Sequence, residues 1–506
     1  MNKIIKIDNL EAVSKKLKKE KKKIVLCHGV FDLLHIGHLN YFKSSKIKGD
    51  TLVVSVTPGK FVNKGINRPY NTDKDRIDFL SSIEIIDHIV LNTTATAVNV
   101  IEKLKPDYYS KGPDYKNLDK DITGEIKNEI KALNRVKGKI IFTNDRTLSS
   151  SKILNSYDNT LNDDQKKFLN FFKTKFDISY INHYLEKIKS LKVTVIGEII
   201  LDKYIFCETI GKSGKEPHLV LKELENEKYL GGVGAIANNT ALFCESLKLI
   251  SYTGKNESQI KFIKQKLSKK IKKNFIEKKN SPTIEKKRFI DHISKSKILG
   301  VYNLNDQNLD IREEKKLYKI IKSNLNKSDL VITSDYGHGL ISPKIAKLIS
   351  SKKVYFALNA QLNAFNIGYH SLTKYNNINF LIINEAELRH EIRDKLSSVE
   401  VLIDKLNKVL KIDNLVITQG KKGAVFYNKK NKAKIYCPAF ANNVVDKVGA
   451  GDAMLSIMSL LCKAGCHPMV SLFLGSLAAA QNVEKLNNSA PLSKSMLTQY
   501  ANYMIK

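Results

Sequence analysis

The sequence predicts an α/β protein with two doubly wound domains, because short apolar strands alternate with helical stretches in two separate parts of the chain. Its 506 residues also exceed what one hydrophobic core usually serves. In the first part, strands are expected at 23–28, 51–56 and 87–91, with helices from about 36, over 73–82 and over 95–104. In the second part, strands are expected at 192–196, 330–334, 354–358, 380–383 and 415–418. Such alternation is typical of parallel sheets with helices on both faces.

The same pattern predicts three segments. A first domain is expected over 1–155, a helical connector over 156–190 and a second domain over 191–506. The connector is predicted to be helical because residues 161–189 are polar and charged and contain neither glycine nor proline.

The charge of the chain is strongly positive, with 85 Lys and Arg against 51 Asp and Glu, a formal net charge of +34. This excess could indicate nucleic acid, an anionic membrane or phosphorylated small molecules as partners. The lysines are spread along the chain without interleaved aromatic residues, which favours a solvated basic surface that steers small anions. No signal peptide, long apolar span or Cys-x-x-Cys pair is evident, so we expect a cytoplasmic protein with no membrane or nucleic-acid partner.

The most informative stretch of the first part is Gly29-Val30-Phe31-Asp32-Leu33-Leu34-His35-Ile36-Gly37-His38, a strand-to-helix turn. Two histidines three residues apart lie on one side of the first helical turn, where free backbone amides and the helix dipole favour phosphate. Attack on the α-phosphorus of a nucleoside triphosphate builds negative charge, so positioned donors supply most of the catalysis.

This stretch resembles the nucleotidyltransferase superfamily, in particular its cytidylyltransferase and heptose-phosphate adenylyltransferase branch, over about 23–154. The resemblance implies a Rossmann-like domain in which His35, His38 and Lys46 are catalytic. It also implies nucleotide or phosphate binding by Gly29, Phe31, Asp32, Arg76, Lys111, Gly112, Asp114, Ser149, Ser150 and Ser151. The serine-rich loop and Pro113 depart from the usual pattern of the family, which leaves ATP and CTP open as the nucleotidyl donor.

The second part carries Gly449-Ala450-Gly451-Asp452 at the start of an apolar helix. Consecutive small residues let backbone amides approach a transferring phosphoryl group, and an aspartate there can take a proton from an attacking hydroxyl. The string resembles the ribokinase-type (PfkB) carbohydrate kinases over about 193–493, which implies a ribokinase-like domain with a small lid and Asp452 as general base. The resemblance implies nucleotide or phosphate binding by Asn384, Glu387, Thr418, Gly420, Gly449, Ala450 and Gly451, and sugar binding by Asp202, Gly231, Gly232 and Asp446. Glu387 is expected to organise Mg²⁺ indirectly.

Several positions depart from the kinase pattern. Glu198 replaces an aspartate, Ala235 a sugar-binding asparagine, and Asn359 an aspartate of the heptose kinases. Lys447-Val448 also replace residues that usually include threonine. These differences leave the sugar open.

As a whole, the chain resembles the bifunctional heptose kinases and adenylyltransferases of lipopolysaccharide-precursor synthesis, with the two modules in reverse order. The resemblance implies ATP- and Mg²⁺-dependent phosphorylation of a sugar or sugar phosphate. It further implies nucleotidyl transfer from ATP or CTP to a sugar 1-phosphate, with pyrophosphate release and an ADP-heptose-like product, by a homodimer. One alternative is a CTP-dependent cytidylyltransferase whose degenerate second domain serves sugar binding or dimerisation. The other is a nucleic-acid-binding protein, which only the charge suggests.

Overall fold

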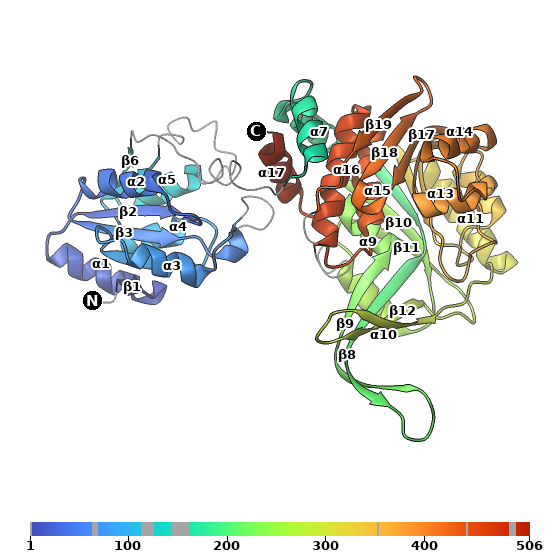
Figure 1. The fold of residues 1–506 in the computed structure, drawn as a ribbon, viewed down its shortest axis with the longest axis horizontal. Helices are drawn as coiled ribbons and strands as arrows, with labels where there is room; N and C mark the ends of the chain where they lie inside the picture. The colour runs from blue at the N-terminus through green and yellow to red at the C-terminus, as the bar shows by residue number, and fades with distance from the viewer. Residues whose placement is uncertain are drawn as a thin grey trace. The chain divides into compact units, whose positions relative to one another are not determined.

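The computed structural model describes residues 3–62, 69–112, 126–143, 161–351, 354–441, 444–484 and 492–505. The chain divides into two compact units, Met1–Thr160 and Leu161–Lys506 (Figure 1). Within these described ranges, no helix is long and apolar enough to cross a membrane.

The first unit is built on a six-stranded parallel sheet with the order β1-β4-β3-β2-β5-β6. Its strands are β1 (Ile4–Ile5), β2 (Ile24–Gly29), β3 (Thr51–Val56), β4 (His88–Leu91), β5 (Tyr108–Lys111) and β6 (Lys139–Phe142). Its helices are α1 (Leu10–Lys19), α2 (Ile36–Lys46), α3 (Asp73–Ser81), α4 (Val98–Leu104) and α5 (Ile126–Arg135). Apolar residues of α1, α4 and α5 pack in one core, and those of α2 and α3 in another. The doubly wound fold is therefore confirmed.

The strand order reverses direction between β2 and β5. The chain proceeds from β2 to β3 and β4 on one side, and then from β5 to β6 on the other. Ligands of open α/β sheets bind in the crevice that such a reversal leaves at the carboxyl ends of the strands. The glycine turn after β2 and the start of α2 lie at this edge.

The second unit has a nine-stranded sheet with the order β11-β10-β7-β14-β15-β16-β17-β18-β19. Its strands are β7 (Lys192–Gly197), β10 (Ser246–Thr253), β11 (Ile271–Glu277), β14 (Leu330–Asp335), β15 (Tyr355–Ala360), β16 (Asn377–Asn384), β17 (Lys411–Thr418), β18 (Ala424–Asn428) and β19 (Ala433–Cys437). Among these described strands, the β17–β18 and β18–β19 pairs are antiparallel and the other pairs are parallel. The central strands are continuous apolar runs because helices cover both faces.

The helices of the second unit alternate with these strands. They are α9 (Val233–Thr240), α10 (Glu257–Lys266), α11 (Ile311–Leu325), α12 (Pro343–Ile349), α13 (Glu385–Ile392), α14 (Val399–Val409), α15 (Ala450–Lys463), α16 (Pro468–Val483) and α17 (Lys494–Ile505). A separate sheet, β13-β12-β8-β9, forms the predicted lid. It contains β8 (Ile199–Lys212), β9 (Leu219–Gly232), β12 (Ile284–Asp291) and β13 (Lys297–Asn303), and the β8–β9 hairpin projects from the unit (Figure 1).

The segment expected to be a connector belongs to the second unit by its packing. It contains α7 (Asp163–Lys173) and α8 (Ile178–Lys187). The ring of Phe172 lies 4.7 Å, centroid to centroid, from that of Phe473 on α16, and Phe168 lies 6.1 Å from Phe440. Phe168 and Phe172, one helical turn apart on α7, therefore anchor this helix to the second unit.

This packing predicts a large difference between two neighbouring phenylalanines of α7. Phe172 is fully buried, whereas Phe171 is 48% exposed. We expect Phe172→Ala to lower the free energy of unfolding of the second unit by about 3–5 kcal/mol through the cavity it creates, and Phe171→Ala by less than about 1 kcal/mol. Calorimetric unfolding of the full chain measures both, and equal effects of the two variants would contradict the assignment of α7.

Candidate active sites

The first candidate site is the turn from β2 into α2. His35 is the N-cap of α2, and its Nδ1 accepts a hydrogen bond of 3.0 Å from the backbone amide of Gly37. This bond assigns the proton of the neutral ring to Nε2, which is buried with no partner among the described residues. The rings of His35 and His38 lie 4.1 Å apart, centroid to centroid, so the structure brings the predicted pair together. Burial lowers the pKa of His35 and favours the neutral donor.

Three predicted binding residues build this turn. Phe31 adopts a left-handed backbone (φ 48°), and its ring lies 3.0 Å from where a Cβ on Gly29 would be. The ring edge also faces His38, with centroids 5.7 Å apart. The carboxylate of Asp32 accepts the backbone amides of Tyr70 and Asn71, each at 2.9 Å. Gly29, Phe31 and Asp32 therefore shape the turn around the histidines.

The guanidinium of Arg76 holds the same turn through hydrogen bonds to backbone carbonyl oxygens. This structural role differs from the nucleotide or phosphate binding that was expected of it. Its Nη1 donates to the carbonyl oxygens of Val30 (2.6 Å) and Thr57 (2.9 Å), and its Nη2 to Asp73 (2.7 Å). The side chain is buried and both terminal nitrogens are engaged within the protein. Its guanidinium stabilises the loop, and nothing in this geometry directs it at a phosphate.

Lys46 is also placed differently from the expectation. It is the last residue of α2. The 11-residue length of this helix places it about 15 Å from His35 along the helix axis. Its Nζ donates to Asp50 O at 2.6 Å and to Asp87 at 2.5 Å, both of which precede strands. A helix that follows a parallel strand returns to the amino edge of the sheet, so Lys46 lies at the edge opposite the histidines. The catalytic assignment of Lys46 is therefore contradicted by its position.

Lys111 ends β5, next to the strand reversal. Its Nζ lies 3.0 Å from the Glu129 carboxylate, and both side chains are buried. Glu129 also accepts from the Tyr109 hydroxyl and the Ala97 amide, each at 2.9 Å. Burial alone would raise the pKa of Glu129, but Lys111 and the other partners lower it, so the carboxylate is ionised.

Other predicted residues of this unit flank the same edge. Gly112 follows Lys111 with open space beside its Cα. His28, which the motif did not single out, is half-buried near the end of β2, where its ring contacts Ser55 (3.1 Å) and Thr57 (3.3 Å). Burial lowers the pKa of His28 to about 4, so it is neutral. The predicted residues Asp114, Ser149, Ser150 and Ser151 lie outside the described residues.

The second candidate site centres on Asp452, in the first turn of α15. Gly449 is the N-cap of this helix, and its φ of 86° favours glycine. The space beside Gly451 is open. Asp452 is buried, and its Oδ1 accepts from the Tyr336 hydroxyl and the Gln361 side-chain amide, each at 3.2 Å. Burial is the main cause that raises the pKa of Asp452 to about 7. The carboxyl group thus lies in the first turn of α15, against Tyr336 and Gln361, with a pKa near neutral pH.

Tyr336 and Gln361 are functional candidates that the sequence did not reveal. Tyr336 lies in Ser334-Asp335-Tyr336-Gly337-His338-Gly339, a string that resembles the heptose kinases without a stated role for the tyrosine, and Gln361 belongs to no motif. Both directly follow buried parallel strands, β14 and β15. A polar residue at a strand's carboxyl end was the one signal available for Gln361.

The predicted sugar-binding residues lie on or beside the lid. Asp202 on β8 forms an ion pair with Arg288 on β12, and a Cβ on Gly231 would overlap its carboxylate. Gly232 has a φ of 57°, which favours glycine. Both positions therefore require glycine, Gly231 for space and Gly232 for its backbone conformation. Asp446 accepts from the Tyr204 hydroxyl and from Lys297 Nζ, each at 2.7 Å. These partners, on β8 and β13, lower the pKa of Asp446 against the effect of burial. Asp446 therefore ties strands of the lid to the segment ahead of α15, and its expected sugar binding stays a prediction.

The predicted nucleotide-binding residues follow β16 and β17. Asn384 and Glu387 cap α13 reciprocally: Asn384 Oδ1 accepts from the Glu387 amide (2.8 Å), and Glu387 accepts from the Asn384 amide (2.7 Å). The other Glu387 oxygen accepts from the Leu362 amide (3.2 Å), and burial raises the pKa of Glu387 to about 7. Thr418 ends β17, and Gly420 (φ 59°) starts the short 3₁₀ turn Gly420–Lys422. Asp452, Glu387 and Asp202 are close enough to interact electrostatically.

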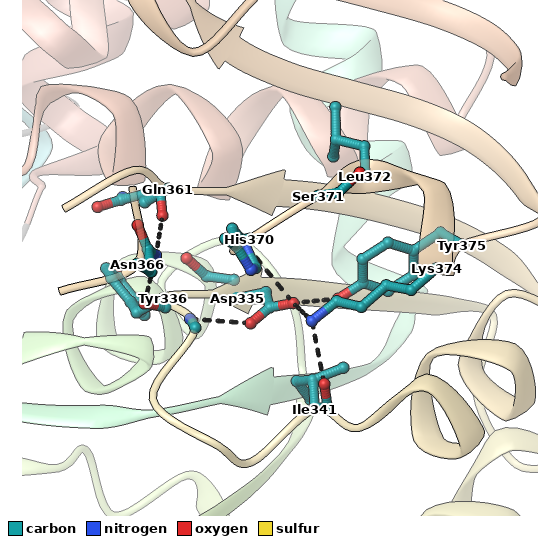
Figure 2. Close-up of polar contacts among 12 residues, drawn as sticks. Asp335, Tyr336, Ile341, Gln361, Asn366, His370, Ser371, Leu372, Lys374 and Tyr375 are labelled. Atoms are coloured by element: carbon teal, nitrogen blue, oxygen red, sulfur yellow. Dashed lines mark hydrogen bonds and ion pairs between the residues drawn. The ribbon is translucent and has the colours of Figure 1, made fainter. Parts of the chain in front are cut away.

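The loop that carries Tyr336 is held by buried carboxylates (Figure 2). Asp335 contacts Lys374 Nζ at 2.6 Å and accepts from the Tyr375 hydroxyl at 2.7 Å. Glu198 accepts the Tyr336 amide at 3.1 Å and the His338 amide at 3.3 Å. Burial and the nearby Asp335 raise the pKa of Glu198. Glu198, which replaces an aspartate of the kinase pattern, therefore holds the backbone of the loop that carries Tyr336.

The other departures are also accommodated. Asn359 on β15 accepts from the Ser334 hydroxyl (3.3 Å) and donates to Ile382 O (2.8 Å), so its amide joins three neighbouring strands. Ala235 is buried in α9, and Lys447 is exposed ahead of α15.

Family models of known proteins match both units of the chain. The pfkB family carbohydrate kinase model matches residues 190–495, and the cytidylyltransferase-like model matches residues 26–156. The bifunctional protein HldE of Nitratiruptor sp. is 38% identical over 135 residues, which cover 26% of this chain and 29% of that protein. HldE of Haemophilus influenzae is 26% identical over 313 residues, 60% of this chain and 63% of that protein. Each match thus spans less than two thirds of the relative.

A solved structure supports the fold of the second unit. Phosphofructokinase-2 from Escherichia coli, in complex with potassium, is 16% identical with a TM-score of 0.51, covering 62% of this chain and 99% of that one. The kinase model matches more than half of the chain. The chain therefore belongs to the pfkB family of carbohydrate kinases and carries a cytidylyltransferase-like domain ahead of its kinase domain.

Proposed function

We propose that the chain makes a nucleotide-activated sugar in two separate reactions. The second unit would phosphorylate a sugar or sugar phosphate with ATP. The first unit would join a nucleotide to a sugar 1-phosphate and release pyrophosphate, giving an ADP-heptose-like product. The observation that carries the proposal is Asp452, a buried carboxyl group at a glycine-initiated helix start, facing residues from the carboxyl ends of β14 and β15.

In the kinase reaction, Asp452 acts as general base toward the attacking hydroxyl. The amides of Gly449, Ala450 and Gly451 hold the transferring phosphoryl group at the positive end of α15. Asp202, beside the glycine pair of β9, orients the sugar. Asn384, Thr418 and Gly420 line the strand ends where the nucleotide lies.

Magnesium fits this site in an indirect way. The described residues hold no group of three or more His, Cys, Asp or Glu that could bind a metal ion. Both oxygens of Glu387 accept backbone amides, yet each retains a lone pair for a water molecule. Mg²⁺ that arrives with the nucleotide would neutralise phosphate charge, and Glu387 would contact it through water.

In the nucleotidyl reaction, the attacking oxygen of a sugar 1-phosphate is already anionic, so the protein needs donors rather than a base. His35 Nε2–H and His38, at the positive end of α2, are proposed to lie where charge develops on the α-phosphate and the leaving pyrophosphate. Lys111 and Gly112 at the neighbouring strand end, with Asp114, Ser149, Ser150 and Ser151, are proposed to hold the triphosphate. The donor base and a homodimeric state stay predictions.

The alternative is a CTP-dependent cytidylyltransferase with a degenerate second domain. Ala235, Asn359 and Lys447 favour it, because they replace residues of the usual kinase pattern. Against it stands the intact constellation of Asp452, the glycine turn and Glu387.

The first prediction of this proposal concerns Asp452→Asn. We expect ADP formation to fall by about 10²–10⁴-fold, because the amide cannot accept the proton, while pyrophosphate formation is unchanged. Purified protein with Mg²⁺, ATP or CTP, and a panel of sugars, sugar phosphates and sugar 1-phosphates reports ADP and pyrophosphate separately. Unchanged ADP formation in the variant would exclude the kinase assignment and favour the cytidylyltransferase alternative.

The second prediction compares the two ends of α2. We expect His38→Ala to lower pyrophosphate formation by about 10²–10³-fold, as loss of a transition-state donor does. Lys46→Met serves as the matched control on the same helix and should change the rate by less than about threefold, because its ammonium pairs with Asp87 at the other edge of the sheet. A defect in Lys46→Met as deep as that of His38→Ala would restore a catalytic role for the lysine.

The third prediction is the pH dependence of the kinase. Burial raises the pKa of Asp452 to about 7, and only the ionised form accepts a proton. The rate of ADP formation should therefore rise about tenfold per pH unit below pH 7 and level off above it. The profile of kcat at saturating substrates measures this, and a flat profile between pH 5.5 and 8 would rule out Asp452 as the titrating base.

A further inference from the structure

One oxygen of Asp452 accepts hydrogen bonds from two neutral donors, each of which directly follows a different strand. The Tyr336 hydroxyl and the Gln361 side-chain amide both lie 3.2 Å from Oδ1. Within the described part of the chain, no hydrogen bond is recorded to Oδ2. The plane of the carboxyl group is thus fixed through one oxygen, and the other is left for a substrate.

A buried asparagine ties the two donor segments together. Asn366 Nδ2 donates to the carbonyl oxygens of Tyr336 (3.0 Å) and Gln361 (2.8 Å), as Figure 2 shows. Asn363 Nδ2 donates to the same Tyr336 oxygen at 2.7 Å, and Glu198 accepts the Tyr336 amide. Asn366 is 4% exposed. The spacing of the two donors is therefore set by a closed hydrogen-bond network and not by the strands alone.

We propose that Tyr336 and Gln361 are positioning residues that hold Oδ1 of Asp452, so that Oδ2 is the atom that accepts the substrate proton, and that Asn366 fixes their spacing. This proposal rests on the proposed kinase function. The sugar O–H bond breaks and its proton goes to Oδ2. The oxygen's electron pair forms the bond to the γ-phosphorus of ATP, and the bond between that phosphorus and the β-phosphate oxygen breaks, with ADP leaving with the electron pair.

The surroundings of Asp452 explain why these neutral donors matter. Burial raises its pKa, and the negative charges of Asp202 on β8 and Glu387 on α13 raise it further. Lys286 on β12 and the Tyr336 hydroxyl lower it. A hydrogen bond to a carboxylate stabilises the ionised form. Removing a donor should therefore raise the pKa of Asp452 and reduce its ionised fraction at neutral pH.

The test uses the full-length chain as wild type, Tyr336→Phe, Gln361→Met and the double variant. Tyr500→Phe, which removes a buried hydroxyl on α17, is the matched control. Two readouts are taken: the acid limb of kcat for ADP formation, and the infrared carbonyl band of protonated Asp452, identified by its loss in Asp452→Asn. The second readout needs no substrate.

We expect each single variant to move both titrations to higher pH by about half to one unit, and the double variant by more. At pH 7, kcat should fall about two- to fivefold, with KM changed by less than about twofold. Asn366→Ala should move the titrations in the same direction, and the control should match wild type.

Two results would overturn the proposal: an infrared titration that does not move in either single variant, or a rise in KM with kcat and the acid limb unchanged, which would make the side chains substrate contacts. Failure of the kinase function is distinguishable. If the wild type forms no ADP with any sugar, the proposed reaction falls, and the infrared titration still decides whether Tyr336 and Gln361 hold Asp452.

Discussion

Parallel strand pairing is the constraint on which both candidate sites depend. Strands joined by crossover helices all end at one edge of the sheet, and each following helix starts at that edge. In the first unit this places the end of β2 and the start of α2 beside the end of β5. In the second it aligns the ends of β14, β15, β16 and β17. Helix starts and strand ends thus supply the amide donors and side chains of both sites.

Burial sets the electrostatics of the kinase site. Carboxylates taken out of water are stable only when donors or cations replace the lost hydration. Asp335 has Lys374 and Tyr375, and Glu198 has three backbone amides, so these two carboxyls fix a loop. Among the described residues, Asp452 accepts hydrogen bonds from two neutral side chains, and burial raises its pKa as it raises that of Glu198. Both oxygens of Glu198 accept backbone amides, so this carboxyl group fixes the loop, whereas Asp452 accepts side-chain donors on one oxygen and is proposed to exchange a proton.

The sequence predicted the fold well, because β2, β3 and β14 are the short apolar runs from which strands were expected. It also located His35 and His38, since a turn and a helix start are local features. Lys46 could not be placed from order alone, because only the crossover geometry shows which end of α2 faces the strand ends. The surroundings of Arg76 and Asp446 could not be predicted either, because their partners come from distant segments, such as Thr57 and Lys297. Gln361 had no motif, so only the structure brings it to Asp452.

The central claim is that one chain carries two nucleotide sites, each at the strand ends of its own unit. Hydrogen–deuterium exchange with ATP and with CTP, in the presence of Mg²⁺ and without any sugar acceptor, tests it most directly. The account predicts slowed exchange in two separate sets of amides, one at the β2–α2 turn and one at the starts of α13 and α15. Protection confined to a single unit with either nucleotide would contradict it.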